Sequence, residues 1–187
     1  MKISSSILAL LMSIISLNVL ANSLPPWNKS PQLEALIVDF EQTYQEATHE
    51  LLKKKMTQVN NLSYFIRFID KEGAPEQAQL KAFLLGTQQA YASSVYNQIQ
   101  MNIRPWFCPK GGQLGIRPAS DNPTQFIENV IWEALERSLK MDPDGFKRSN
   151  GVAAFMPTNS AVQYGLQTQY PCHQVIPEAH RMNGWPY

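Results

Sequence analysis

Apolar residues recur every three or four positions through most of the chain, a spacing that places them on one face of a helix. One such series runs from Leu33 to Leu52 behind Ser30-Pro31, a hydroxyl N-cap followed by proline at the first helical position. Sustained alternation of apolar and polar residues, which is typical of half-buried strands, does not occur. The pattern therefore predicts an all-α fold, a compact bundle of about five helices.

The expected helices cover about residues 31–55, 62–71, 75–101 and 122–141, and a last helix begins at about residue 158. Asn122 is the predicted N-cap of the fourth helix, and a turn at residues 142–145 is predicted to end it. On that helix Glu133 and Glu136 are expected on a solvated face. The third helix carries a run of small residues, from Gly86 to Ser94, that is predicted to let a neighbouring helix approach closely.

The first residues have the pattern of a secretory signal peptide. A basic Met1-Lys2 start precedes an apolar run over residues 7–20, which ends in Val19-Leu20-Ala21. We predict a signal peptide over residues 1–21, cleaved after Ala21, and one domain over residues 22–187. The apolar run is too short for a permanent membrane span, so no span is expected in the mature chain.

Charge offers little support for a polyanionic partner. Without Lys2, 15 basic residues balance 15 acidic ones, which is not the pattern of a nucleic-acid or anionic-lipid binder. Three consecutive lysines, residues 53–55, are interpreted as the last turn of a helix, where they complement the helix dipole.

The two cysteines, Cys108 and Cys172, are predicted to form a disulfide, because an exported chain with an even number of cysteines usually pairs them. A nucleophilic or metal-binding cysteine with His173 as its partner is the alternative. Adjacent residues rarely present their side chains to a common point, and only His49 and His180 remain as histidine ligands. We therefore expect no metal site.

Catalytic motifs are lacking in the sequence. No serine lies in a G-x-S-x-G elbow, no H-E-x-x-H occurs, and the glycines near residue 111 do not have the spacing of a phosphate-binding loop. The sequence therefore predicts a protein that is not an enzyme and holds no cofactor.

Short pieces around the cysteines resemble a known family. They are Ala82-Phe83-Leu84-Leu85-Gly86, Phe107-Cys108-Pro109, Met141-Asp142-Pro143 and Tyr170-Pro171-Cys172. Their order is similar to that of the Rap/Tai family, small periplasmic immunity proteins that protect bacteria from peptidoglycan amidases delivered by type VI secretion. The similarity covers about residues 80–172. Residues 145–157 are an insertion relative to the family pattern, and the first helix and the aromatic tail lie outside it.

The resemblance implies a periplasmic inhibitor that binds an amidase-type effector and occludes its active site by inserting a loop. It also implies a homodimer, since members of the family often form one. The alternative is a periplasmic chaperone or assembly factor that binds a protein partner through a helical groove.

The expected partner contacts lie on the loop at residues 109–118. Lys110, Gln113 and Arg117 are its predicted polar contacts and Leu114 its apolar tip. The loop lies between a cysteine and a capped helix, so both its ends are anchored, and functional residues often lie on loops held by a rigid scaffold. A plain solvent-exposed connection is the alternative for this segment.

Overall fold

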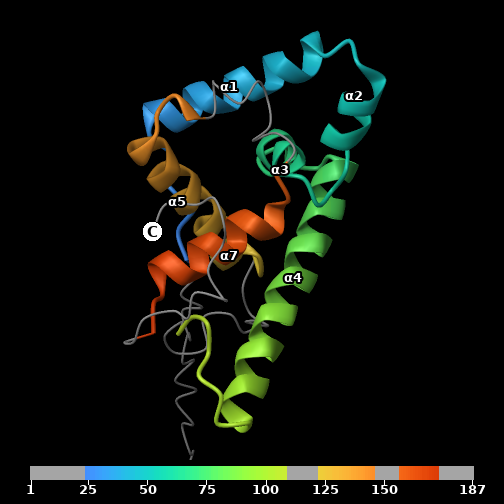
Figure 1. The fold of residues 1–187 in the computed structure, drawn as a ribbon. Coiled ribbons are helices and arrows are strands. Elements are labelled where there is room, and N and C mark those ends of the chain that lie inside the picture. The colour runs from blue at the N-terminus through green and yellow to red at the C-terminus, as the bar shows by residue number, and fades with distance from the viewer. Residues whose placement is uncertain (1–23, 109–121, 146–155, 173–187) are drawn as a thin grey trace, which may run out of the picture.

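The computed structural model describes residues 24–108, 122–145 and 156–172, and within these ranges the chain forms six α-helices and no strand (Figure 1). The all-α fold is thus confirmed, with six helices rather than five in the described part. The helices are α1 (Pro31–Glu46), α2 (Glu50–Met56), α3 (Leu62–Phe68), α4 (Pro75–Gln100), α5 (Gln125–Met141) and α7 (Thr158–Gln169).

The first predicted helix is broken in two, which corrects the expectation of one helix to residue 55. The backbone of Ala47 and His49 is extended, and α2 starts anew at Glu50. Leu51 and Leu52, expected on the buried face, are 65% and 40% exposed, so continued helical periodicity here does not reflect burial. The break instead lets α2 turn back, so that Met56 reaches the core.

The N-terminus of α5 also differs from the expected one. The N-cap is Thr124 rather than Asn122. Asn122 instead holds the preceding turn, because its Oδ1 accepts hydrogen bonds from the backbone N–H and the hydroxyl of Thr124 at 3.3 and 2.8 Å. The C-terminal end is as predicted, with a turn closed by the hydrogen bond from Gly145 N to Asp142 O at 3.1 Å.

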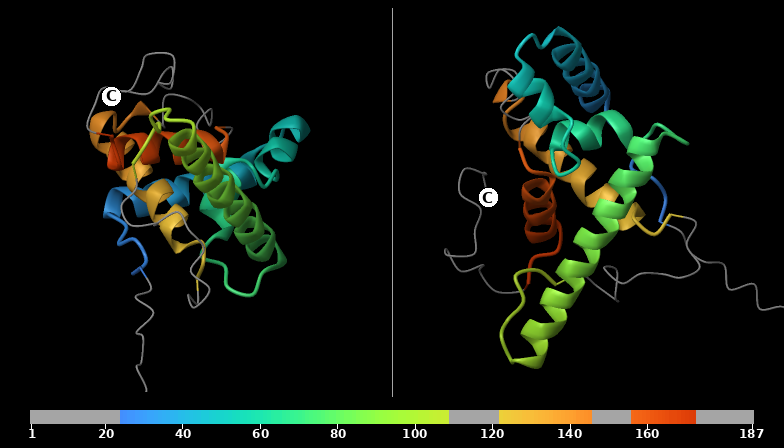
Figure 2. Two further views of the ribbon diagram at one scale, coloured as in Figure 1. Left: turned by 90° about the horizontal axis from the view of Figure 1, so that it is seen from below. Right: turned by 90° about the vertical axis from the view of Figure 1, so that its right-hand side faces the viewer.

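The centre of the molecule is the contact between α5 and α7, which cross closely (Figures 1 and 2). Gly165 on α7 makes this possible: a Cβ added there would lie 2.6 Å from Val130 Cγ1 and 2.7 Å from the Val130 carbonyl oxygen. The side chain of Gln169, one turn further along α7, donates to the same carbonyl at 2.9 Å. The two helix backbones are therefore in near contact.

α3 connects this pair of helices to α1. Its Phe65 ring packs on Trp132 of α5, with ring centroids 4.8 Å apart. Arg67 is buried and its guanidinium lies 3.3 Å from the ring centroid of Tyr44 on α1, while its Nε donates to Glu41 Oε2 at 3.0 Å. Burial acts to raise the pKa of Glu41, but the hydrogen bonds from Arg67 and Gln45, together with the positive charges of Arg67 and Lys71, outweigh it and lower the pKa below its ordinary value.

Glu136 joins the N-terminus of α1 to α5, whereas the sequence placed it on a solvated face. Ser30 is the N-cap of α1, as predicted, and its Oγ accepts from Leu33 N at 3.2 Å. The Ser30 backbone N–H and hydroxyl in turn donate to the two Glu136 carboxylate oxygens at 2.7 and 2.8 Å. Glu136 is only 6% exposed, so this carboxylate is an internal acceptor. Its neighbour Glu133 does form the expected surface pair with Arg137, at 3.1 Å.

We expect Glu136→Ala to lower the free energy of unfolding by about 1–3 kcal/mol, because it leaves the partly buried donors of Ser30 without their acceptor. Urea unfolding followed by circular dichroism measures the loss. Glu133→Ala is the matched control on the same helix, since it removes only a surface pair with an expected contribution of about 0–1 kcal/mol. Equal losses in the two variants would contradict the assigned role of Glu136.

α4 is the longest helix and runs along one side of the molecule, past α7 and beyond it (Figures 1 and 2). At 1.5 Å per residue its 26 residues span about 39 Å. Its buried residues are Leu80, Leu84, Thr87 and Gln88, all in the first part of the helix. Beyond Gln88, Tyr91, Ala92 and Val95 still pack against the core but are only partly buried, and most of the last residues of α4 are exposed.

Candidate partner-binding surface

The segment after α4 turns back along the helix. Asn102 has a positive φ of 55°, and two hydrogen bonds close the turn, from Asn102 N to Ile99 O at 3.1 Å and from Ile103 N to Gln98 O at 2.7 Å. This pair of bonds around a left-handed residue is a Schellman motif, in which asparagine takes the place that glycine usually holds. The turn sends residues 104–108, the return segment, back toward α7.

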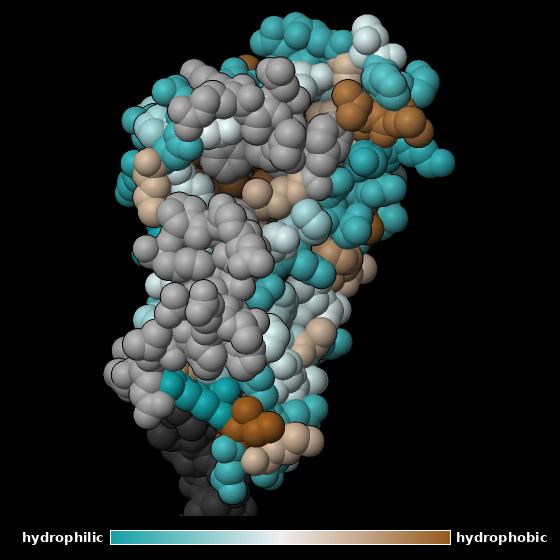
Figure 3. Space-filling model, in the orientation of Figure 1, coloured by the Kyte–Doolittle hydropathy of each residue, from teal (hydrophilic) through white to brown (hydrophobic). Residues whose placement is uncertain are grey.

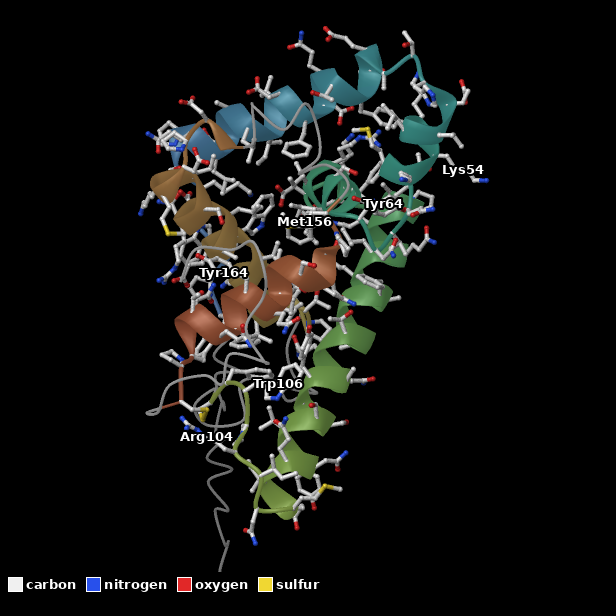
Figure 4. All side chains as sticks on the ribbon, in the orientation of Figure 1. Lys54, Tyr64, Arg104, Trp106, Met156 and Tyr164 are labelled. Atoms are coloured by element: carbon white, nitrogen blue, oxygen red, sulfur yellow. A yellow bond between two sulfur atoms is a disulfide. The ribbon has the colours of Figure 1, made fainter. Side chains whose placement is uncertain are left out.

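The return segment is fixed at its far end by aromatic packing and by the disulfide. Phe107 is 2% exposed and meets the Tyr91 ring of α4 edge-on, with centroids 5.7 Å apart. Cys108 N donates to the Tyr170 carbonyl at 2.8 Å, and Cys108 is bonded to Cys172 with a Cα–Cα distance of 5.1 Å. The predicted disulfide is confirmed. It fastens the return segment to the end of α7 (Figure 4).

A groove of about 510 Å³ lies between α4, the return segment and the start of α7. Figure 4 shows Trp106 of the return segment beside α4. The described lining consists of small, aromatic and uncharged polar side chains: Ala82, Phe83, Gly86, Thr87, Ala90, Tyr91, Ser94, Trp106, Phe107 and Asn159. This corrects the expectation that the small residues of α4 receive a neighbouring helix, since a Cβ added at Gly86 would meet nothing within 4 Å.

The groove has no ionised group among its described lining residues. Burial raises the pKa of the Tyr91 hydroxyl, so Tyr91 stays neutral. Its hydroxyl lies 3.5 Å from the Asn159 carbonyl, to which it donates. An environment of this kind favours an uncharged, largely apolar occupant with a few polar atoms.

The described residues that flank the loop predicted to contact a partner, Cys108 and Pro123, both lie near α4. At its start, Cys108 follows Phe107, which packs on α4. Beyond its end, the Pro123 carbonyl accepts from Gln88 Nε2 of α4 at 3.3 Å. Lys110, Gln113, Leu114 and Arg117 themselves lie outside the described residues. The structure thus holds the described residues on either side of the loop, Cys108 and Pro123, close to one helix, and Phe107 before Cys108 lines the groove.

The described part of the chain forms no site for the alternative of a nucleophilic or metal-binding cysteine with a histidine partner. His49 precedes α2 on the surface, and His173 and His180 lie outside the described residues. Among residues 24–108, 122–145 and 156–172, no group of three or more His, Cys, Asp or Glu side chains could hold a metal ion. In the same ranges, no helix combines the length and the apolar composition that crossing a membrane requires.

Sequence reasoning missed the groove, although a signal for it was present. From Ala82 to Ile103 the chain carries no Asp, Glu, Lys, Arg or His, whereas a solvated helix face normally carries charge. Depletion of charge together with Tyr, Trp and Met is typical of the centre of protein–protein interfaces.

Comparison with protein-family models, with curated proteins and with solved structures finds no match to this chain.

Proposed function

We propose that this protein binds another protein through the groove beside α4 and the loop at residues 109–118, which follows the return segment. The observation that carries the proposal is the uncharged, aromatic groove of about 510 Å³ directly beside the disulfide-fastened start of the loop. Binding surfaces that are already ordered lose little conformational freedom on association, so a cross-linked scaffold supports tight binding.

For the partner we propose a peptidoglycan amidase delivered by type VI secretion, which this protein would inhibit in the periplasm by occluding its active site. The support is the resemblance of residues 80–172 to the Rap/Tai family, with Phe107-Cys108-Pro109 and Tyr170-Pro171-Cys172 at the two ends of the disulfide. In this mechanism the protein is not an enzyme. It acts by steric exclusion of substrate, with Lys110, Gln113, Leu114 and Arg117 as contacts.

A periplasmic chaperone or assembly factor is the second candidate, and the composition of the groove favours it. A groove lined by Phe83, Tyr91 and Trp106, with no charged side chain among its described lining, suits an extended apolar segment of an unfolded or incompletely assembled protein. Such a protein would bind many apolar peptides weakly, whereas an immunity protein binds one folded amidase tightly.

We expect the combined variant Lys110→Ala, Gln113→Ala, Leu114→Ala, Arg117→Ala to weaken inhibition of the amidase by at least about thirtyfold, the effect of losing one binding hot spot. The measurement is peptidoglycan hydrolysis by type VI amidases at increasing concentrations of this protein, with thermal unfolding of each variant. Lys54→Ala combined with Lys55→Ala is the control, because it removes the same number of basic charges from α2.

The same assay distinguishes the two candidates. Absence of inhibition across the amidases tested, together with weak binding of unrelated apolar peptides that Trp106→Ala abolishes, would favour the chaperone. Inhibition that survives the loop variant would exclude the predicted loop contacts.

A further inference from the structure

The α4 side of the groove, the groove floor, carries small side chains that are open to solvent. Ala82, Gly86, Ala90 and Ser94 follow one another at steps of four along the helix, and all four are exposed. At 1.5 Å per residue they span about 18 Å. A Cβ added at Gly86 would meet nothing within 4 Å, so an aromatic ring can lie against the helix backbone there.

Aromatic side chains flank the groove floor and are covered only in part. Phe83, Tyr91 and Trp106 pack against the core, but each keeps some of its surface exposed. Aromatic rings that meet offset or edge-on stabilise a contact by about 0.5–1.5 kcal/mol beyond the effect of the area that they bury. The groove therefore favours an occupant that brings aromatic rings of its own.

Apolar surface continues beyond the groove at the C-terminal end of α4. Ile99, Met101 and Ile103 are 55%, 68% and 51% exposed, and Figure 3 shows the apolar surface at this end of the helix. From Ala82 to Ile103 the chain carries no ionisable side chain apart from tyrosine. A charged occupant would lose hydration here without gaining an opposite charge on this stretch, so an uncharged occupant is favoured.

A segment of this chain continues from a point next to the groove. Cys172 is bonded to Cys108 with 5.1 Å between their Cα atoms, and Cys108 follows Phe107, which lines the groove. Residues 173–187, the tail, follow Cys172 and lie outside the described residues. Trp185 is 13 positions after Cys172, a reach of about 43 Å in an extended chain. That reach is more than twice the length of the groove floor.

The composition of the tail matches that of the groove. Residues 182–187 have no charged side chain and include Trp185, Pro186 and Tyr187. Among the segments outside the described residues, only the tail contains Trp or Tyr. A residue that precedes proline is restricted to extended backbone, so Trp185 has less conformational freedom to lose on binding.

We propose that the tail docks in the groove of its own chain through Trp185 and Tyr187 and competes there with a protein partner. A segment joined to its site by a short linker is presented at an effective concentration of about 1 mM, so even a weak contact is populated. The docking concerns this chain alone, whereas the competition rests on the proposed function of the groove. A partner would bind only those molecules whose groove the tail has left, which raises its apparent Kd.

Cross-linking tests the docking with the purified protein alone. Ser94→Cys on the groove floor, combined with Gly184→Cys beside Trp185, should form a disulfide within one molecule on mild oxidation. Thr43→Cys on exposed α1, combined with Gly184→Cys, is the matched control, and its yield should be at least about tenfold lower because no docking raises the local concentration there. Peptide mapping by mass spectrometry identifies the new bridge and checks that the Cys108–Cys172 bond is intact.

A labelled peptide tests whether the tail occupies the groove. Fluorescein-labelled peptide 179–187 should bind Trp185→Ala combined with Tyr187→Ala at least about fivefold more tightly than wild type, because the altered tail leaves the groove free. Val175→Ala combined with Ile176→Ala is the control in the same tail and should bind the peptide as wild type does. Adding Trp106→Ala to the first variant should abolish its gain. Fluorescence anisotropy measures binding, and circular dichroism checks that each variant folds.

The possible outcomes separate the docking from the proposed function. Equal cross-linking at Ser94 and Thr43, or equal binding of the peptide to wild type and to the Trp185 and Tyr187 variant, would overturn the docking. Bridges between two molecules would place the tail on a second copy and would also overturn it. If the docking is observed but no amidase is inhibited, the proposed function fails and the docking stands. If wild type and the tail variant inhibit an amidase equally, the competition is overturned.

Discussion

Replacing Gly165 by alanine is expected to lower the free energy of unfolding by about 2 kcal/mol, although alanine is the better helix former by about 1 kcal/mol. The new Cβ would lie 2.6 Å from Val130 Cγ1 and 2.7 Å from the Val130 carbonyl oxygen, distances that real Cβ atoms do not tolerate. The carbonyl cannot rotate away without giving up its hydrogen bond from Gln169 Nε2. α5 and α7 must therefore move apart, and the core contacts between them loosen.

Gly86→Ala is the matched control for this change. Gly86 also lies inside a helix, but a Cβ there meets nothing within 4 Å. The substitution should therefore raise the free energy of unfolding by roughly 0.5–1 kcal/mol, through helix propensity alone. Urea unfolding of both variants, followed by circular dichroism, gives the two values. Stabilisation by both substitutions would show that the α5–α7 contact is looser than described.

Loss of the disulfide should have the largest effect on stability. We expect Cys108→Ser combined with Cys172→Ser to cost about 2–5 kcal/mol, because the bridge joins residues 64 positions apart and restricts the unfolded chain accordingly. It also holds the return segment to α7, next to the hydrogen bond from Cys108 N to Tyr170 O. The free energy of unfolding in urea measures the loss.

Reduction of the wild-type protein provides an independent control for the double variant. Dithiothreitol should lower the stability of wild type to that of the variant and leave the variant itself unchanged. A variant that reductant destabilises further, or a wild type that is indifferent to reductant, would contradict a stabilising bridge.

The helices that the sequence predicted best are those whose ends carry local signals. α7 begins at Thr158 and α5 ends at the turn after Met141, since Pro157 and the residues Asp142-Pro143-Asp144-Gly145 each favour a boundary there. The break between α1 and α2 has no such signal. The apolar spacing continues through Leu51 and Leu52, yet these side chains are exposed and Met56 is the buried residue of α2.

Residues that act across long sequence separations could not be predicted from local pattern. The residues next to Glu136 in the sequence are those expected around a surface glutamate. The partner that it meets in the fold is Ser30, 106 positions earlier. Gly165 reads as an ordinary helix glycine until Val130 is placed against it. The disulfide was predictable because the chain has only two cysteines and a predicted signal peptide. The groove was not, because it forms only when the return segment folds against α4.

The position of the disulfide makes residues 108–172 a closed covalent ring that contains the loop proposed to contact a partner. A protease that cuts one peptide bond anywhere between Cys108 and Cys172 therefore opens the ring without releasing a fragment. The two pieces stay joined through sulfur until a reductant is added. A molecule that is cut once in the ring therefore keeps its full mass on a non-reducing gel. A cut in the loop can thus be made while the helices stay covalently joined.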